Sequence, residues 1–167
     1  MHSPEQTTAQ NTTFDRLYDI VAQSGLPFFL HTHQTTRTVE EATQNLSFDV
    51  SRIVKTVAFG TRDGGLILAA LRGIRRVAYP GLASMAGLGR RDLAALSPDM
   101  VLTRLGVAPG SVSPLSALGE ALLCIDADVL TIAPTLYCGL GRPDRTLEIA
   151  PADLIRLTGG RVGDFSK

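Results

Sequence analysis

The sequence predicts a single domain of the α+β class. Its 167 residues suit one domain, and 44% hydrophobic against 19% charged content is enough to bury a core. A strong hairpin signal, Asp63-Gly64, lies between two apolar segments and makes part of the sheet antiparallel. Strands and short helices follow one another without the regular alternation of a doubly wound sheet. These observations favour a compact mixed sheet flanked by helices.

A polar tail and a helix are expected at the N-terminus. Residues 1–12 predict a flexible tail, which leaves 13–167 as the domain. Thr12 and Asp15 match a capping signature and an apolar stripe follows, so a helix is expected over 13–24. The next two predicted elements are a strand over 28–33 ("FFLHTH") and a helix over 38–46 ("TVEEATQNL").

A β-hairpin is predicted at the centre of the chain. The segment 53–60 is rich in β-branched and aromatic residues, and 66–71 ("LILAAL") is the returning strand. The segment 75–80 extends the second strand or pairs with it. This hairpin is the strongest local signal in the sequence.

Short elements fill the rest of the chain. Ser97 as cap, Pro98 at the first position and Gly106 at the end predict a helix over 97–106. The other predicted elements are helices over 82–88, 90–96 and 151–160, strands over 121–130, 135–141 and 145–150, and a loop over 107–115.

Composition argues against several functional classes. The formal net charge is zero, which is unlike the basic face of most nucleic-acid-binding domains, and we expect no DNA partner. Five arginines form either a small basic patch or an ordinary solvated surface: Arg72, Arg75, Arg76, Arg90 and Arg91. No apolar run reaches the roughly 20 residues that span a bilayer, and the N-terminus lacks a signal peptide pattern. We therefore expect a cytoplasmic protein without a membrane partner.

The familiar cofactor, metal and nucleophile motifs are missing from the sequence. It contains no dinucleotide fingerprint, Walker loop, zinc-protease helix or nucleophile elbow, so we expect no cofactor. His31 and His33 share one strand face, but without an evident third ligand we expect no metal. One structural and one pocket-lining histidine is the expectation. Cys124 and Cys138 lie in apolar contexts and predict buried, reduced thiols.

Lys55 is a charged residue on an otherwise apolar strand face. Alternation places it beside Ile53, Val57 and Phe59. Of the 16 basic residues, Lys55 and Lys167 alone are lysines, so this chain otherwise uses arginine. Either the amine extends into water from the strand, or it faces a cleft and holds an anion or a polarised carbonyl. The strand pattern leaves both open.

The turn "GSVSP" at 110–114 offers a second candidate feature. Gly110 permits a positive φ or a close backbone approach to a ligand, and exposed amides in such turns bind carbonyl oxygens or anions. An ordinary surface loop has the same composition. The turn alone does not decide between these interpretations.

Four segments in order resemble the YbaK-like family of free-standing aminoacyl-tRNA deacylases, which are related to the editing domain of bacterial prolyl-tRNA synthetase. They are "FFLHTH", "IVKTVAF", "GVAPGSVSPL" and "LYCGLGRPDRTLEIAPADLIRLTGG", and the match covers residues 14–160. The resemblance implies a mixed, mostly antiparallel sheet curved around a pocket. It also implies hydrolysis of a mischarged aminoacyl-tRNA of tRNA-Pro type carrying a small amino acid. The implied partners are the tRNA acceptor end and prolyl-tRNA synthetase.

The same resemblance assigns the site residues. Lys55 corresponds to the family's active-site lysine, and Gly110 to the loop that places the aminoacyl carbonyl, so these two are the implied catalytic residues. The implied substrate-binding residues are His33, Thr56, Ser111, Ser113, Pro114, Gly139 and Thr146. Cysteinyl-tRNA-editing members carry Ser and Asp where this chain has Gly139 and Thr146, so cysteinyl specificity is not implied. A non-catalytic ligand-binding module and a hydrolase of other small esters are the alternatives.

Overall fold

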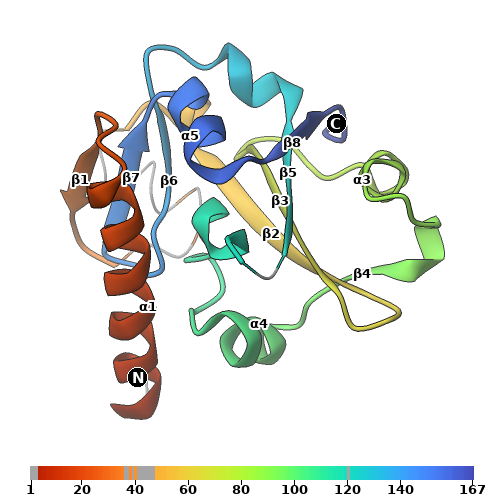
Figure 1. Cartoon of the computed structure of the whole chain (residues 1–167), viewed down its shortest axis with the longest axis horizontal. Coiled ribbons are helices and arrows are strands. Elements are labelled where there is room, and N and C mark those ends of the chain that lie inside the picture. Colours follow the sequence, from red (N-terminus) through yellow and green to blue (C-terminus); the bar gives the residue numbers. More distant parts are fainter. Residues whose placement is uncertain (1–3, 36–37, 39, 41–47, 120) are drawn as a thin grey trace.

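The computed structural model describes residues 4–35, 38, 40, 48–119 and 121–167 (Figure 1). The helices are α1 (Pro4–Gln23), α3 (Tyr79–Met85), α4 (Pro98–Leu105) and α5 (Pro151–Thr158). The strands are β1 (Phe29–Thr32), β2 (Val54–Thr61), β3 (Leu66–Arg72), β4 (Leu93–Ala95), β5 (Leu122–Asp126), β6 (Leu136–Gly139), β7 (Arg145–Ile149) and β8 (Arg161–Gly163). The helix expected over 38–46 falls largely outside the described residues.

The strands form two sheets. A five-stranded sheet has the order β4-β2-β3-β5-β8, and a three-stranded sheet has the order β1-β7-β6. Pairing is antiparallel except for β3–β5 and β5–β8, which are parallel. An isolated bridge between Ile53 and Tyr137 joins the two sheets. The predicted mixed, mostly antiparallel α+β fold is confirmed, with two joined sheets in place of one.

The core lies on both faces of the five-stranded sheet. β3 is its central strand and all residues but the last are buried, because both of its faces are covered. The larger core cluster includes Val54 and Ala58 from β2 and packs under α1, α4, α5 and the smaller sheet. The smaller cluster includes Phe59 and packs under α3 and the C-terminal Phe165. The two faces of β2 therefore contact different clusters.

Helix α1 is longer than the sequence predicts. It begins at Pro4, so residues 4–12 of the expected tail belong to the helix, which runs along the smaller sheet in Figure 1. The apolar stripe was placed correctly, since Leu17 and Val21 are fully buried. The start was missed because the polar first turns carry no periodic apolar signal. The domain boundary at residue 13 stays a prediction.

Two other predicted elements are wrong in part. Residues 90–96 form a short 3-10 turn followed by β4, not a helix, because Ala94 and Ala95 pair with the edge of β2. The strand expected over 121–130 ends at Asp126, where a 3-10 helix over 127–131 takes over. The strand β8 was not predicted.

No helix among the described residues has the length and apolar character needed to cross a membrane.

Candidate active site

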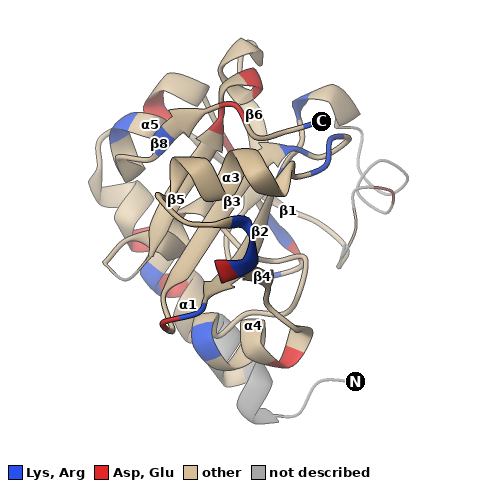
Figure 2. Ribbon diagram, turned by 90° about the vertical axis from the view of Figure 1, so that its right-hand side faces the viewer, with Lys and Arg blue, Asp and Glu red and all other residues tan. Residues whose placement is uncertain are grey.

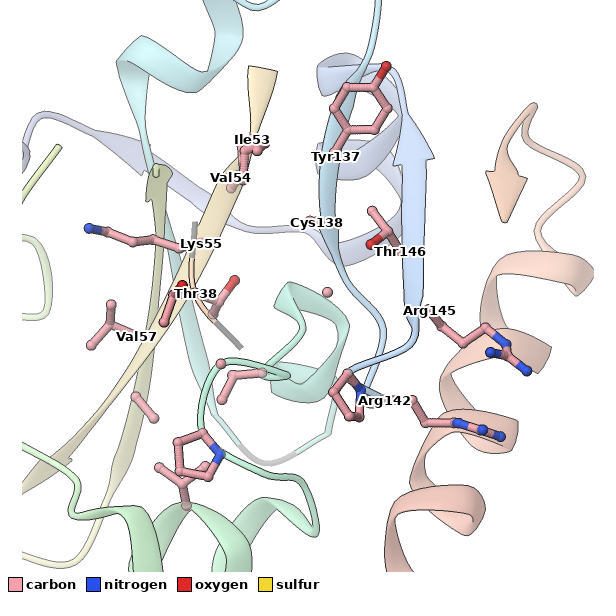
Figure 3. Close-up of a pocket in the computed structure, with 18 of the residues that line it drawn as sticks. Thr38, Ile53, Val54, Lys55, Val57, Tyr137, Cys138, Arg142, Arg145 and Thr146 are labelled. Atoms are coloured by element: carbon pink, nitrogen blue, oxygen red, sulfur yellow. The ribbon is translucent and has the colours of Figure 1, made fainter. Parts of the chain in front are cut away.

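A cavity of about 360 Å³ opens beside the edge of β2, between the two sheets (Figure 3). It is bounded by the loop before the 3-10 turn at Pro114 and by the β6–β7 hairpin. Five of the sequence-predicted site residues line it: Lys55, Thr56, Gly110, Gly139 and Thr146. His33, Ser111, Ser113 and Pro114 are not among its lining residues.

The cavity exists because part of a strand edge is open. Ile53 bridges to Tyr137, and the Ala58 carbonyl accepts a hydrogen bond from the Leu96 amide at 2.9 Å. Between these points, residues 55–57 have no strand partner on that edge among the described residues. The opening therefore reaches groups from both faces of β2.

Lys55 lies at the rim of this cavity. It shares a strand face with Val57 and Phe59, as alternation predicts, whereas Val54 and Ala58 belong to the larger core cluster on the other face. Figure 3 shows Lys55 and Val57 projecting from the side of β2 that faces away from Tyr137 and Thr146. The amine therefore flanks the opening instead of pointing at its apolar floor.

The Lys55 amine is half-buried and forms no ion pair with a carboxylate of the described residues. Burial, followed by the positive charge of Arg76, lowers the pKa of Lys55, and the negative charge of Glu40 opposes this with a smaller effect. No carboxylate of the described residues forms an ion pair with it. An anion or a carbonyl oxygen of a bound ligand therefore stabilises this partly desolvated cation.

The loop that carries Gly110 approaches from the side of the larger cluster, to which Val112 belongs. Gly110 has φ of 87°, a left-handed conformation that explains the need for glycine. The Ser111 amide is used within the turn, where it donates to the Ala108 carbonyl at 3.0 Å. Within the described chain, the amides of Gly110 and Val112 have no hydrogen-bond acceptor. These two amides are the available donors of the loop.

Ser111, Ser113 and Pro114 are buried behind the cavity wall. The Ser113 hydroxyl accepts a hydrogen bond from the Leu115 amide at 3.2 Å and caps the following 3-10 turn. The Ser111 carbonyl accepts from the Gly141 amide at 3.1 Å, which ties the loop to the β6–β7 hairpin. In this structure these residues cap and pack the loop, and their contacts with a substrate stay a prediction.

Gly139 is needed for close packing of the same loop. A Cβ at this position would lie 2.8 Å from the Val112 carbonyl oxygen and 3.3 Å from that of Ser111. Both contacts are to backbone, which cannot move independently of the loop. The position therefore holds the wall of the cavity together and has no room for a side chain such as serine.

We expect Gly139→Ala to lower the free energy of unfolding by about 1–3 kcal/mol, because the new methyl group forces the Gly110 loop away from β6. Urea denaturation of the variant and wild type measures this loss. Gly89→Ala is the matched control, since its Cβ meets only the movable end of the Asp92 side chain, at 3.2 Å. Equal stability of Gly139→Ala and wild type would contradict the packing argument.

Thr146 and His33 form a polar pair at the wall of the cavity. Thr146 pairs with His31 of β1 and with Gly139 of β6. The side chains of Thr146 and His31 therefore lie on the same face of the smaller sheet. The Thr146 hydroxyl and His33 Nε2 are 2.8 Å apart, and His33 Nδ1 lies 2.6 Å from the Gln34 carbonyl oxygen. His33 was expected to line the pocket, but it is not among the lining residues and reaches the cavity wall through Thr146.

His31 belongs to a structural network on the same face. Its Nε2 lies 2.7 Å from Oε1 of Glu148, which also interacts with Arg52 and accepts a hydrogen bond from Thr135. Phe48 stacks on Tyr137 with ring centroids 4.0 Å apart, and the Arg52 guanidinium lies over Tyr137. The network fixes Tyr137 at the cavity wall, which agrees with the expected structural histidine.

We expect this network to weaken at acid pH. Burial opposes ionisation of Glu148, but hydrogen bonds from Thr135 and His31 and the charge of Arg52 together hold its pKa below the usual value. A depressed pKa contributes stability that is present at neutral pH and is lost as the pH falls through the folded-state pKa. Glu148→Gln should therefore show a smaller loss of unfolding free energy than wild type as the pH is lowered from about 5 to about 3, below the ordinary pKa of a glutamate. Parallel losses in the two proteins would count against this role.

Several lining residues were missed at the level of sequence. Tyr137, Cys138, Arg142 and Arg145 lie in predicted strands or their hairpin, but nothing in the local pattern pointed to a cavity. Burial raises the pKa of Cys138 to about 12, so its thiol is neutral and unreactive. Among the described residues, no group of three histidine, cysteine or acidic side chains is arranged to hold a metal ion.

Three of the five arginines considered as a basic patch form contacts within the protein. Arg72 pairs with Asp128 at 2.7 Å, Arg75 pairs with the same carboxylate at 3.4 Å, and Arg90 lies over the Tyr79 ring. Figure 2 shows basic and acidic segments interspersed over this side of the molecule. The interpretation as an ordinary solvated surface fits these contacts better.

Comparisons with known proteins agree with this fold. Proline--tRNA ligase of Xanthomonas oryzae pv. oryzae (strain MAFF 311018) is 32% identical over 99 residues, which are 59% of this chain and 17% of that ligase. The chain thus spans about a sixth of the length of this relative. The solved structure of hypothetical protein APE2540 is 28% identical with a TM-score of 0.82, covering 91% of this chain and 99% of that one.

A further solved structure shares the fold over the whole chain. It is a candidate trans-editing enzyme for prolyl tRNA synthetase, with 24% identity, a TM-score of 0.74, and coverage of 100% of this chain and 99% of that one. The family model of the aminoacyl-tRNA editing domain matches residues 33–157, a range that contains every residue of the cavity wall. With three quarters of its length in that match, this chain belongs to the aminoacyl-tRNA editing domain family.

Proposed function

We propose that this protein is a free-standing deacylase that hydrolyses the ester of mischarged aminoacyl-tRNA. The observation that carries the proposal is the cavity itself. It combines a half-buried lysine amine without a close carboxylate and two loop amides without an acceptor in the described chain. Such groups suit a ligand that has both an anionic part and a carbonyl group.

The arrangement supports the binding of different parts of the substrate on the two sides of β2. The Lys55 amine at the rim holds the terminal phosphate of the acceptor end. The amides of Gly110 and Val112, on the other side, hold the ester carbonyl and stabilise its developing negative charge. Loss of one such donor typically costs about 10²–10³ in rate. The nucleophile is a water molecule or the ribose hydroxyl of the substrate.

The apolar wall of the cavity supports a small amino acid. Its apolar part is formed by side chains such as Val54, Ala58, Val101 and Val112. Exclusion of a larger side chain is more effective here than recognition of a missing methylene, which yields only about 1–3 kcal/mol. We propose alanine, serine, threonine, cysteine or 2-aminobutyrate as the edited residue. The similarity to part of a Proline--tRNA ligase supports a tRNA of the proline type and a role beside prolyl-tRNA synthetase.

A panel of mischarged tRNAs tests this function. We expect release of a small amino acid from at least one mischarged tRNA, and no release of proline from prolyl-tRNA-Pro. Binding without turnover of any member would support a non-catalytic module instead. Faster turnover of free amino-acid esters than of aminoacyl-tRNA would support a general esterase.

A further inference from the structure

We propose that Thr146 is the residue that recognises the amine of the aminoacyl group, and that His33 positions it for this task. The proposal rests on the proposed function and names a specificity device within the same cavity. Thr146 lines the cavity on β7, whereas His33 follows β1, is not among the lining residues and contacts the Thr146 hydroxyl. His33 is thus a positioning residue that does not itself touch the ligand.

The surroundings of His33 fix its tautomer. Its Nδ1 lies 2.6 Å from the carbonyl oxygen of Gln34, and a carbonyl only accepts hydrogen bonds. Nδ1 therefore carries the proton of the neutral ring. Nε2 then holds a lone pair, and the Thr146 hydroxyl, 2.8 Å away, donates its proton to it.

This hydrogen bond sets the direction of the Thr146 hydroxyl. A hydroxyl group has one proton and two acceptor lone pairs. With its proton given to His33, the Thr146 oxygen presents only lone pairs to the cavity. It therefore binds a ligand group that donates a hydrogen bond, such as an amine, and gains nothing from a carbonyl oxygen or a methyl group.

The charged residues in the described part of the cavity wall offer no carboxylate as an alternative acceptor. Among the described lining residues the charged side chains are Lys55, Arg142 and Arg145, and none is a carboxylate. The nearby Asp144 is paired with both arginines, at 2.9 Å and 2.8 Å. Among these described residues, Thr146 is therefore an acceptor that an entering amine can use. The Thr56 hydroxyl, which is buried and has no partner in the described chain, has no neighbour that sets its direction.

Two non-hydrolysable ligands test the proposal: 3′-amino-3′-deoxyadenosine carrying an alanyl amide, and the same nucleoside carrying a propionyl amide. They differ only in the α-amine. We expect the wild-type chain to bind the alanyl compound about 10- to 100-fold more tightly by calorimetry, the range of one charge-assisted hydrogen bond. Thr146→Val should lose this preference and keep the propionyl affinity, while Thr146→Ser should retain the preference.

The positioning role of His33 has its own variant. His33→Phe should lose most of the preference for the alanyl compound although Thr146 is still present, because the hydroxyl is free to turn its proton toward the cavity. Thr103→Val, an exposed threonine on α4, is the matched control and should behave like wild type. Unchanged propionyl affinity in each variant shows that the cavity is intact.

The outcomes separate this inference from the proposed function. Equal binding of both compounds to wild type, or an unchanged preference in Thr146→Val, overturns the inference and leaves the deacylase proposal standing. A covalent acyl group trapped on Thr146 during turnover also overturns it, since the hydroxyl would then be a nucleophile. Failure of wild type to bind either compound or to deacylate any tRNA overturns both.

Discussion

Lys55→Met is expected to lose function without losing stability. The amine is half-buried, its pKa is lowered by burial and by Arg76, and no carboxylate among the described residues pairs with it. Replacing it with an apolar chain of similar length removes a desolvation cost and no favourable ion pair. Its free energy of unfolding should therefore equal or exceed that of wild type, as measured by urea denaturation.

The activity of Lys55→Met should fall sharply. A charged hydrogen bond to a phosphate contributes about 1.5–3 kcal/mol, so kcat/KM for a mischarged tRNA should drop about 10- to 100-fold. Lys55→Arg keeps the charge and should recover part of this loss. If kcat/KM of Lys55→Met equals that of wild type, Lys55 has no role in the mechanism.

A small substrate then locates the atom that Lys55 holds. Alanine ethyl ester has the carbonyl but no phosphate, so its hydrolysis by Lys55→Met should be close to that by wild type. An equal loss with the small ester and with tRNA would instead place the amine at the carbonyl. The placement of Lys55 on the side of β2 away from Thr146 is the reason to expect the first result.

The sequence predicts well what depends on local periodicity. Alternation along 53–60 placed Lys55 with Val57 and Phe59, and the Asp63-Gly64 signal predicted the β2–β3 hairpin. Alternation alone does not reveal that the edge of β2 is open at 55–57. That opening depends on where β4 and β6 meet β2, which are contacts between segments distant in the sequence.

The parts that were missed were decided by tertiary contacts. The segment 90–96 has a helix-like composition, but pairing with β2 selects a short strand there. In the turn at 110–114, Gly110 lines the cavity whereas Ser111 and Ser113 are buried. The loop packs against β6 at Gly139, and this packing decides which loop residues face the cavity. The sequence of the loop contains no pattern that predicts this choice.

Asp126→Ala is expected to cause the largest loss of stability. Asp126 is 2% exposed and holds the C-terminal segment through its carboxylate. It accepts hydrogen bonds from the Phe165 amide at 2.9 Å, the Ser166 amide at 3.1 Å and the Ser166 hydroxyl at 2.6 Å. Phe165 is itself 1% exposed and belongs to the smaller core cluster.

Alanine at this position leaves buried amides without an acceptor and loosens the packing of Phe165. Hydrogen bonds to a charged group contribute about 1.5–3 kcal/mol each, but the contributions of neighbouring bonds are not additive. We therefore expect the free energy of unfolding to fall by about 3 kcal/mol. Asp126→Asn keeps one acceptor oxygen and should fall between alanine and wild type. Asp19→Ala, an exposed carboxylate on α1, is the control and should stay within about 0.5 kcal/mol of wild type. A similarly small change for Asp126→Ala would show that Phe165 is held by apolar packing alone.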